Sequence, residues 1–248
     1  MRTSPGSATA SLAPRGPARR VACNRLLAAL PGPDRRRLLE SCEPVELASA
    51  DVLSAPGARV RHVFFPTACF ISLITADVGH DRLEVGLVGD EGMVGGWLAL
   101  GVSTAPVLAL VQGAGRALRM DAGAFRRELE HSLPLARVLD RYRYVLLCQM
   151  MQGMACTRFH VLEARLARWL LMTRDRAHAD QFHVTHETLS DLLGVRRAGV
   201  TRAASSLHGN GLIRYSRGDL EVLDPQGLEL AACSCYAADR ATYARVLG

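Results

Sequence analysis

Residues 185–224 read THETLSDLLGVRRAGVTRAASSLHGNGLIRYSRGDLEVLD, and this stretch predicts two short helices followed by a two-stranded hairpin. Thr185 is a suitable N-cap, because its side-chain oxygen can accept a hydrogen bond from a free amide of the first turn. Gly194 is placed to end the first helix, since glycine enters the left-handed region without steric cost. The predicted apolar face consists of Leu189, Leu192 and Leu193, opposite a polar face of Glu187, Ser190 and Asp191.

The second helix, over residues 196–207, is predicted to have a basic outer face. Its inward residues would be Val200, Ala203, Ala204 and Leu207, and its outward residues Arg196, Arg197, Thr201, Arg202 and Ser205. No acidic residue occurs between Arg196 and Arg217. Guanidinium groups can fork onto guanine or phosphate, and a helix fits the major groove, so this face suits a polyanion.

The hairpin forms the last part of the stretch. Residues 212–215 and 220–223 are alternating runs around a turn that contains glycine, with Arg214 and Arg217 near the tip.

The residues alone leave a second interpretation of the basic helix open, because a helix face rich in arginine is often simply solvated.

The stretch resembles the winged helix-turn-helix of the cyclic-AMP receptor protein/fumarate-nitrate regulator (Crp/Fnr) superfamily. The resemblance lies in the order of its parts, which are a helix, a glycine turn, a basic helix, the tripeptide GLI (211–213) and a basic hairpin. The resemblance implies that Arg197 and Arg202 reach base edges, with Arg196 and Thr201 beside them. It also implies that phosphates are held by Thr185 and His186 at the first helix and by Arg214, Ser216 and Arg217 on the wing. Ala198 stands where some members carry an acidic residue, so the operator sequence cannot be transferred.

Composition restricts the classes of function. The 248 residues are 49% hydrophobic and 22% charged, which is typical of a soluble globular protein with one large or two ordinary domains. The net charge is +6, and all 30 basic residues are arginine. The absence of lysine excludes P-loop, Schiff-base and kinase-type lysine chemistry. Arginine suits phosphate and guanine contacts, although codon usage in a G+C-rich genome explains its excess equally well.

The cysteines indicate a reducing, cytoplasmic setting rather than a disulfide framework. They are odd in number and scattered, at positions 23, 42, 69, 148, 156, 233 and 235. Cys156 and His160 have the i, i+4 spacing of a metal-ligand pair, but two ligands do not make a site. Cys233 and Cys235 are interpreted as small residues of a helix with one facing the core. We therefore predict no metal and no cofactor. No apolar run is long enough to span a bilayer, and no membrane association is expected.

The N-terminal half is predicted to be mostly β-structure. Residues 1–20 contain no acidic residue and are expected to be disordered. Two helices follow, over 24–30 and 33–41, the second with Asp34 as its cap. Strands are predicted over 44–47, 63–65, 69–75, 83–88, 107–111 and 116–119, which is a pattern typical of a barrel or jelly roll. In the resembled family this position holds a double-stranded β-helix that in some members binds a cyclic nucleotide.

The sequence departs from the nucleotide-binding pattern of that family. Where the family has a Gly–Glu pair that contacts the ribose, this chain has Gly95-Gly96-Trp97-Leu98. Where the family has an arginine that contacts the phosphate, it has Ser103-Thr104-Ala105-Pro106-Val107. A buried phosphate without that charge would be costly, so we predict no cyclic-nucleotide binding by the usual mode.

Two other sensor types are known in the resembled family. Cys23 and Cys42 are the only cysteines before the predicted barrel, too few and too far apart for an iron–sulfur cluster. A haem on a single axial ligand stays open, with His62, His80 and Cys69 in the relevant domain. The ordinary interpretation of these three is surface histidines and a core cysteine.

A long helix is predicted from Leu135 to about residue 155, and a further amphipathic helix over 157–176. The apolar band of the long helix is wide and comprises Leu135, Val138, Tyr142, Val145 and Gln149, with Leu139, Leu146, Met150 and Met154. Such a band suggests pairing between subunits, or packing of both sides on the subunit's own barrel. The resemblance favours dimerisation. The inward residues of the 157–176 helix are predicted to be Val161, Leu162, Leu166, Trp169, Leu170 and Met172.

Together these patterns predict an α+β fold. It comprises a disordered tail (1–20), a jelly-roll, cyclic-nucleotide-binding-like domain (21–133), a dimerisation helix (134–156) and a winged helix-turn-helix domain (157–248). The expected function is a cytoplasmic homodimeric transcription regulator, not an enzyme, that binds a palindrome in double-stranded DNA and contacts RNA polymerase. The effector is unknown. Rival hypotheses are a haem- or other ligand-sensing member of the same fold, a β-roll binding protein without DNA activity, and a cysteine hydrolase using Cys69 or Cys148, whose surroundings resemble no nucleophile motif.

Overall fold

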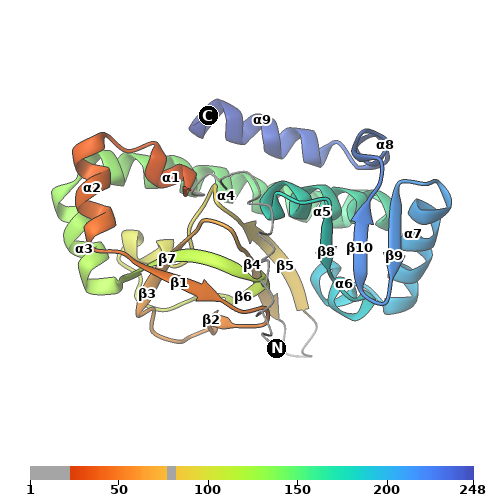
Figure 1. The fold of residues 1–248 in the computed structure, drawn as a ribbon, viewed down its shortest axis with the longest axis horizontal. Coiled ribbons are helices and arrows are strands. Elements are labelled where there is room, and N and C mark those ends of the chain that lie inside the picture. Colours follow the sequence, from red (N-terminus) through yellow and green to blue (C-terminus); the bar gives the residue numbers. More distant parts are fainter. Residues whose placement is uncertain (1–22, 77–81) are drawn as a thin grey trace, which may run out of the picture.

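The computed structural model describes residues 23–76 and 82–248 and is shown in Figure 1. The tail predicted to be disordered, and His80, lie outside the described residues. In chain order the N-terminal elements are α1 (Arg25–Ala28), α2 (Gly32–Glu40), β1 (Glu43–Leu47), β2 (Val52–Ser54), β3 (His62–Pro66), β4 (Phe70–Ala76), β5 (Arg82–Val88), η1 (Gly96–Leu100), β6 (Leu108–Gly113), β7 (Gly115–Asp121) and α3 (Ala122–His131). The C-terminal elements are α4 (Leu133–Phe159), α5 (Leu162–Ala177), β8 (Gln181–His183), α6 (His186–Leu193), α7 (Arg197–Gly209), β9 (Ile213–Ser216), β10 (Asp219–Val222), α8 (Pro225–Ala231) and α9 (Cys235–Leu247).

Two antiparallel sheets form the N-terminal β-roll. One has the order β1-β7-β3 and the other β2-β6-β4-β5. Apolar side chains of both sheets pack against each other, among them Leu47, Phe64, Ile71 and Val111. Strand β3 is buried along most of its length, because its two faces pack in different core clusters, Phe64 between the sheets and Val63 and Phe65 beneath the helices. All six predicted strands are present, and the short strand β2 was missed.

Helices α1 to α4 cover the outer side of the three-stranded sheet. Their core contains Leu27, Leu38, Phe65, Phe125 and Leu135, each almost fully buried. The prediction that Asp34 caps α2 is wrong, because Pro31 is the N-cap. The Asp34 carboxylate instead accepts a hydrogen bond from Ser132 Oγ at 2.7 Å. That bond, more than the adjacent Arg37, lowers the pKa of Asp34.

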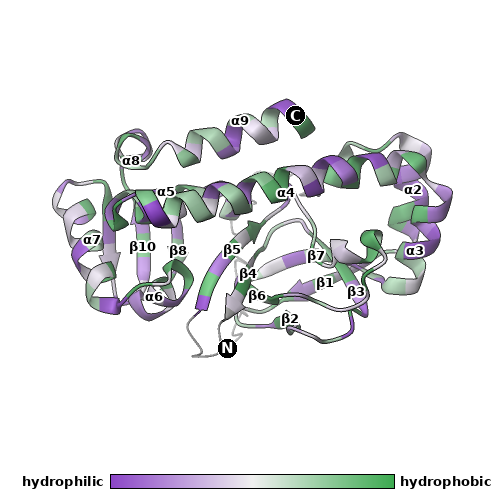
Figure 2. Cartoon of the chain, turned by 180° about the vertical axis from the view of Figure 1, so that it is seen from behind, coloured by the Kyte–Doolittle hydropathy of each residue, from purple (hydrophilic) through white to green (hydrophobic). Residues whose placement is uncertain are grey.

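The long helix α4 runs along the molecule and joins the β-roll to the C-terminal part (Figure 1). Figure 2 shows hydrophobic and hydrophilic segments alternating along it. Four of the nine residues of the predicted dimerisation band, Leu135, Leu139, Tyr142 and Val145, are buried within the subunit. A second apolar row is exposed and comprises Tyr144, Leu147, Met151 and, from the predicted band, Met154. The packing alternative therefore describes one face of α4, and the other face is uncovered.

The boundary between α4 and α5 differs from the prediction. Helix α4 continues to Phe159 and the chain then turns at His160, which has an extended backbone. Val161 precedes α5 and is 73% exposed, so its predicted inward position is wrong. The predicted inward residues Leu166, Trp169, Leu170 and Met172 are buried as expected. Within the described ranges, no helix is both long and apolar enough to cross a membrane.

The C-terminal part consists of α5 to α9 with the sheet β8-β10-β9. Helix α9 lies alongside α4 (Figure 1). Helix α8 ends at Ala231 and α9 begins at Cys235. Cys233 therefore lies in a turn, and both Cys233 and Cys235 are buried, contrary to the expectation that only one faces the core.

Candidate nucleic-acid interface

Helices α6 and α7 and the turn between them follow from local sequence signals. The Thr185 hydroxyl accepts a hydrogen bond from the Thr188 amide at 3.0 Å and caps α6. Gly194 ends α6 with φ of 63°, in the left-handed region where a side chain is disfavoured. A Cβ at Gly194 would also lie 3.1 Å from Leu83 of β5. The turn is therefore close-packed against the β-roll. Ser190, predicted to be polar and outward, is buried, and its hydroxyl donates to the Glu187 carbonyl.

Helix α7 has the two faces that the sequence predicts. Val200, Ala203, Ala204 and Leu207 are buried in the C-terminal core. The opposite face, which we call the recognition surface, is exposed and consists of Arg196, Arg197, Thr201, Arg202 and Ser205. Arg197 Nε lies 3.9 Å from Glu187 Oε2, with both side chains largely in solvent. Such a distant, exposed pair holds a guanidinium only weakly, so it leaves Arg197 free to find another partner.

His186 joins α6, α7 and the wing. Its ring stacks on Tyr215 of β9, with centroids 4.3 Å apart. Its Nδ1 lies 3.1 Å from Thr201 Oγ1, and that hydroxyl donates to the Arg197 carbonyl at 3.1 Å. Nδ1 is therefore the protonated nitrogen that donates to Thr201. Burial, and secondarily the Arg197 charge, lower the pKa of His186 and favour this neutral form.

The wing is the hairpin β9–β10. Arg217 occupies its tip with φ of 51°, followed by Gly218 with φ of 92°. Arg214 is paired across the hairpin with Glu221, at 2.5 Å, whereas Ser216 and Arg217 are exposed. The missed strand β8 adds a third strand beside β10, and its His183 contacts Asp219 at 2.9 Å. All three predicted wing residues are thus exposed, and Arg214 in addition takes part in an ion pair.

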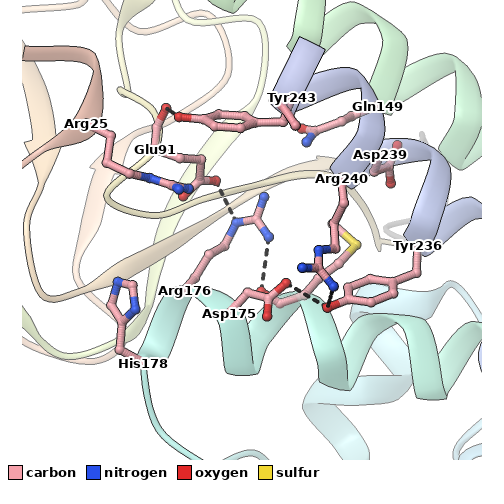
Figure 3. A pocket seen from close by; sticks show the side chains of 12 residues that line it. Arg25, Glu91, Gln149, Asp175, Arg176, His178, Tyr236, Asp239, Arg240 and Tyr243 are labelled. Carbon is pink, nitrogen blue, oxygen red and sulfur yellow. Dashed lines mark hydrogen bonds and ion pairs between the residues drawn. The ribbon is translucent and has the colours of Figure 1, made fainter. Parts of the chain in front are cut away.

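A network of charged residues joins the C-terminal part to the β-roll. Arg176 of α5 is buried and pairs with Glu91 at 2.7 Å. The same guanidinium donates to the carbonyls of Leu87 and Met172, each at 3.0 Å. Figure 3 shows this pair in a cavity of about 370 Å³ that α9 borders through Tyr236, Arg240 and Tyr243. The contacts with Glu91 and Leu87 form a joint between α5 and the β-roll, whereas Met172 lies on α5 itself.

A second contact of this joint involves Glu84 of β5. Trp169 Nε1 of α5 donates to Glu84 Oε1 at 3.0 Å, and Ser72 Oγ donates to its other oxygen. Desolvation raises the pKa of Glu84 to about 7, although both hydrogen bonds oppose the shift. No sequence pattern could have revealed this carboxyl, since its partners come from β4 and α5.

Residues 95–98, which stand at the nucleotide-contacting position of the resembled family, lie beside a small cavity. Helix η1 contains Gly96-Trp97-Leu98, and a cavity of only about 30 Å³ remains between it and α4. Leu73, Met93, Leu139 and Tyr142 line this space. Of the haem candidates, Cys69 is buried and His62 is half-buried on β3.

Comparisons with known proteins agree with this architecture. Residues 164–231 match the family model of the Crp-like helix-turn-helix domain. The sequence has no match among curated proteins.

Several solved structures have a similar fold. A transcriptional regulator of the Crp/Fnr family from Eubacterium rectale has a TM-score of 0.65 and 16% identity, covering 83% of this chain and 96% of its own. The c-di-GMP-responsive global regulator CLP from Xanthomonas campestris has a TM-score of 0.64 and 15% identity, covering 77% and 99%. A Crp/Fnr family transcriptional regulator from Thermus thermophilus has a TM-score of 0.63 and 22% identity, covering 77% and 98%.

The helix pair, the wing and the β-roll thus occur together in one known arrangement. At these identities the structural matches show the fold, and the family model identifies the C-terminal domain. The chain therefore carries a Crp-like helix-turn-helix domain, attached to a β-roll in the fold of the Crp/Fnr transcription regulators.

Proposed function

We propose that the chain is a homodimeric transcription regulator that binds a palindromic operator, with α7 in the major groove and the wing on the backbone. The observation that carries the proposal is the recognition surface, which exposes Arg196, Arg197 and Arg202 on one helix. In this proposal Arg197 and Arg202 contact base edges, while Arg196 and Thr201 lie beside them.

The phosphate contacts come from the helix end and the wing. Thr185 and His186 lie at the N-terminus of α6, where free amides and the helix dipole favour an anion. His186 would act mainly by fixing α6 against α7, because its ring is stacked and hydrogen-bonded. Arg217 and Ser216 can reach a phosphate directly, and Arg214 can do so if it exchanges Glu221 for DNA.

The exposed row of α4 supports a two-fold dimer. Tyr144, Leu147, Met151 and Met154 follow a 3-4-3 spacing and are 50%, 54%, 49% and 66% exposed. This spacing is that of a coiled-coil seam, and pairing two copies would bury the row. A two-fold axis along α4 would present two recognition surfaces to one face of a duplex, about one helical turn apart.

The small cavity beside η1 supports regulation without a cyclic nucleotide. The cavity of about 30 Å³ between η1 and α4 is too small for a nucleotide, and the arginine that lines it, Arg143, comes from α4 and not from η1. Titration with cyclic AMP and c-di-GMP, followed by the melting temperature, tests this part. A saturable increase with either nucleotide would contradict it. Absorbance of the purified protein tests the rival haem hypothesis.

Salt-dependent binding tests the function itself. Fluorescence anisotropy would compare the wild-type chain with the double variant R197A/R202A on a duplex containing its own promoter region. The proposal predicts tight binding with a steep negative salt dependence, both strongly reduced in the variant. A control variant, R35A, changes an arginine of α2 far from the interface and should bind as the wild type does. Binding that is equal for all three proteins would contradict the proposal.

Contacts with RNA polymerase and residence in the cytoplasm belong to the same proposal, because a regulator of this kind works where transcription takes place.

A further inference from the structure

Four metal-binding side chains meet where α4 ends and α9 begins. Cys156 and His160 come from the C-terminal end of α4, and Cys233 and Cys235 from the turn that leads into α9. One ligand atom from each of the four residues lies within 4.8 Å of every other. In the sequence the two pairs are separated by more than 70 residues, so neither pair alone indicates a site.

The distances fit a single tetrahedral ion. Cys156 Sγ lies 3.5 Å from Cys233 Sγ, and Cys235 Sγ lies 3.4 Å from His160 Nδ1. Zn–S bonds of about 2.3 Å and Zn–N bonds of about 2.1 Å place tetrahedral ligands roughly 3.6 to 3.8 Å apart. The two short distances lie within a few tenths of an ångström of these values, and no two of the four atoms are more than 4.8 Å apart. A cluster of several irons, each with its own ligand, would need them farther apart.

The cluster does not resemble an ordinary apolar core. Its buried members are the three cysteines, with the half-buried Ala164 packed against them. Three thiols and an imidazole offer little apolar surface for the helix ends they connect. A disulfide is not formed either, because all seven cysteines are free thiols.

The surroundings suit an anionic zinc–thiolate centre. Three thiolates on a divalent ion leave one net negative charge. Arg165 and Arg168 of α5 line the same cavity of about 60 Å³ as Cys156. Arg168 pairs with Asp239 through Nη2 at 2.6 Å, and its buried Nε has no hydrogen-bond partner among the described residues. Gln152 Nε2 donates to Cys235 Sγ at 3.0 Å, which is the kind of outer contact that orients a metal-bound thiolate.

We propose that Cys156, His160, Cys233 and Cys235 bind one Zn²⁺ in a tetrahedral site. The donor set of three cysteines and one histidine is that of structural zinc, which has no open position for catalysis. The ion would fasten the α8–α9 turn to the bend between α4 and α5. It would therefore hold the C-terminal domain, including the recognition surface, in a fixed orientation relative to α4.

Metal analysis of the full-length chain, purified without chelator under reducing conditions, tests the proposal. We expect about one zinc per chain by inductively coupled plasma mass spectrometry. Replacing zinc by Co²⁺ should give the visible bands of tetrahedral cobalt and thiolate-to-cobalt charge-transfer absorption. Both signals should be lost in C156S and retained in C148S, which removes a cysteine of the same helix outside the cluster.

A gentler variant keeps the test valid if C156S does not fold. Q152A keeps all four ligands and should lower the zinc affinity by about 10- to 100-fold in a competition titration with a chromogenic chelator. Wild-type protein that holds no zinc and gives no tetrahedral cobalt spectrum would overturn the proposal. So would a Cys156–Cys233 disulfide found by mass spectrometry in metal-replete, reduced protein. These readouts do not depend on DNA binding, so the metal site and the proposed function can fail separately.

Discussion

Replacement of Glu84 by glutamine is expected to stabilise the protein at alkaline pH and to have little effect at acidic pH. Glu84 lies where β5 meets α5, and its two oxygens accept hydrogen bonds from Trp169 and Ser72. Burial nevertheless raises the pKa of this carboxyl from 4.5 to about 7. The cost of ionising Glu84 in the folded protein therefore exceeds the strength of its hydrogen bonds.

The size of the effect follows from the displaced pKa. In the folded protein Glu84 binds a proton more tightly than in the unfolded chain, so its contribution is fully present below about pH 4.5 and is lost as pH rises through about 7. The displacement corresponds to about 3 kcal/mol at most. Glu84 is only partly shielded from solvent, so we expect about 1–2 kcal/mol between pH 5 and pH 8.5.

Urea unfolding of wild type and E84Q at pH 5 and pH 8.5 measures this difference. The variant should be more stable than the wild type at pH 8.5 and nearly equal at pH 5, because the neutral carboxyl and the amide form similar hydrogen bonds. E40Q, an exposed control on α2, should stay within about 0.5 kcal/mol at both pH values. A difference between E84Q and wild type that is the same at both pH values would refute the reasoning.

Four further results are expected. R202A should weaken DNA binding by about 1–3 kcal/mol and relax the preference at one base pair, whereas R217A should weaken binding to all DNA sequences evenly and reduce the salt dependence of the affinity. Anisotropy on a panel of operator variants distinguishes these effects, and equal affinity profiles for the two variants would contradict the division of roles. M151E should convert the dimer to a monomer in sedimentation velocity, because it puts a charge into the exposed row of α4. The control L230E, at the 89%-exposed Leu230 of α8, should stay dimeric. A dimeric M151E would exclude the exposed row of α4 as the dimer interface. T185A should cost about 1 kcal/mol of unfolding free energy by removing the cap of α6, and a change within the error of urea titration would show that the bond to Thr188 contributes nothing. R176M should cost about 3–5 kcal/mol because Glu91 loses its buried partner; a melting temperature like that of the wild type would contradict this.

Local signals in the sequence were sufficient to predict the helix-turn-helix. Thr185 as a cap, Gly194 as a left-handed stop and the apolar spacing of α7 each act within a few residues, so their effects are visible without the tertiary fold. The strands of the β-roll were predicted for the same reason. The roles of the predicted DNA-contacting residues stay predictions.

Features that depend on distant partners were not predictable. The side of α4 that is buried is decided by the β-roll, so the predicted band mixed buried Leu135 and Val145 with exposed Met154. The stacking of His186 on Tyr215 depends on how the wing folds back onto α6. The cysteine–histidine cluster requires α9 to return along α4, which neither pair of residues could indicate.

Selection of DNA sequences from a random duplex library by the purified protein tests the central claim most directly. The account predicts enrichment of a two-fold symmetric site whose half-sites are about 10 base pairs apart, centre to centre, and loss of that enrichment in R197A/R202A. Enrichment of no sequence, or of the same asymmetric sequence by both proteins, would contradict the claim that two copies of α7 read one operator.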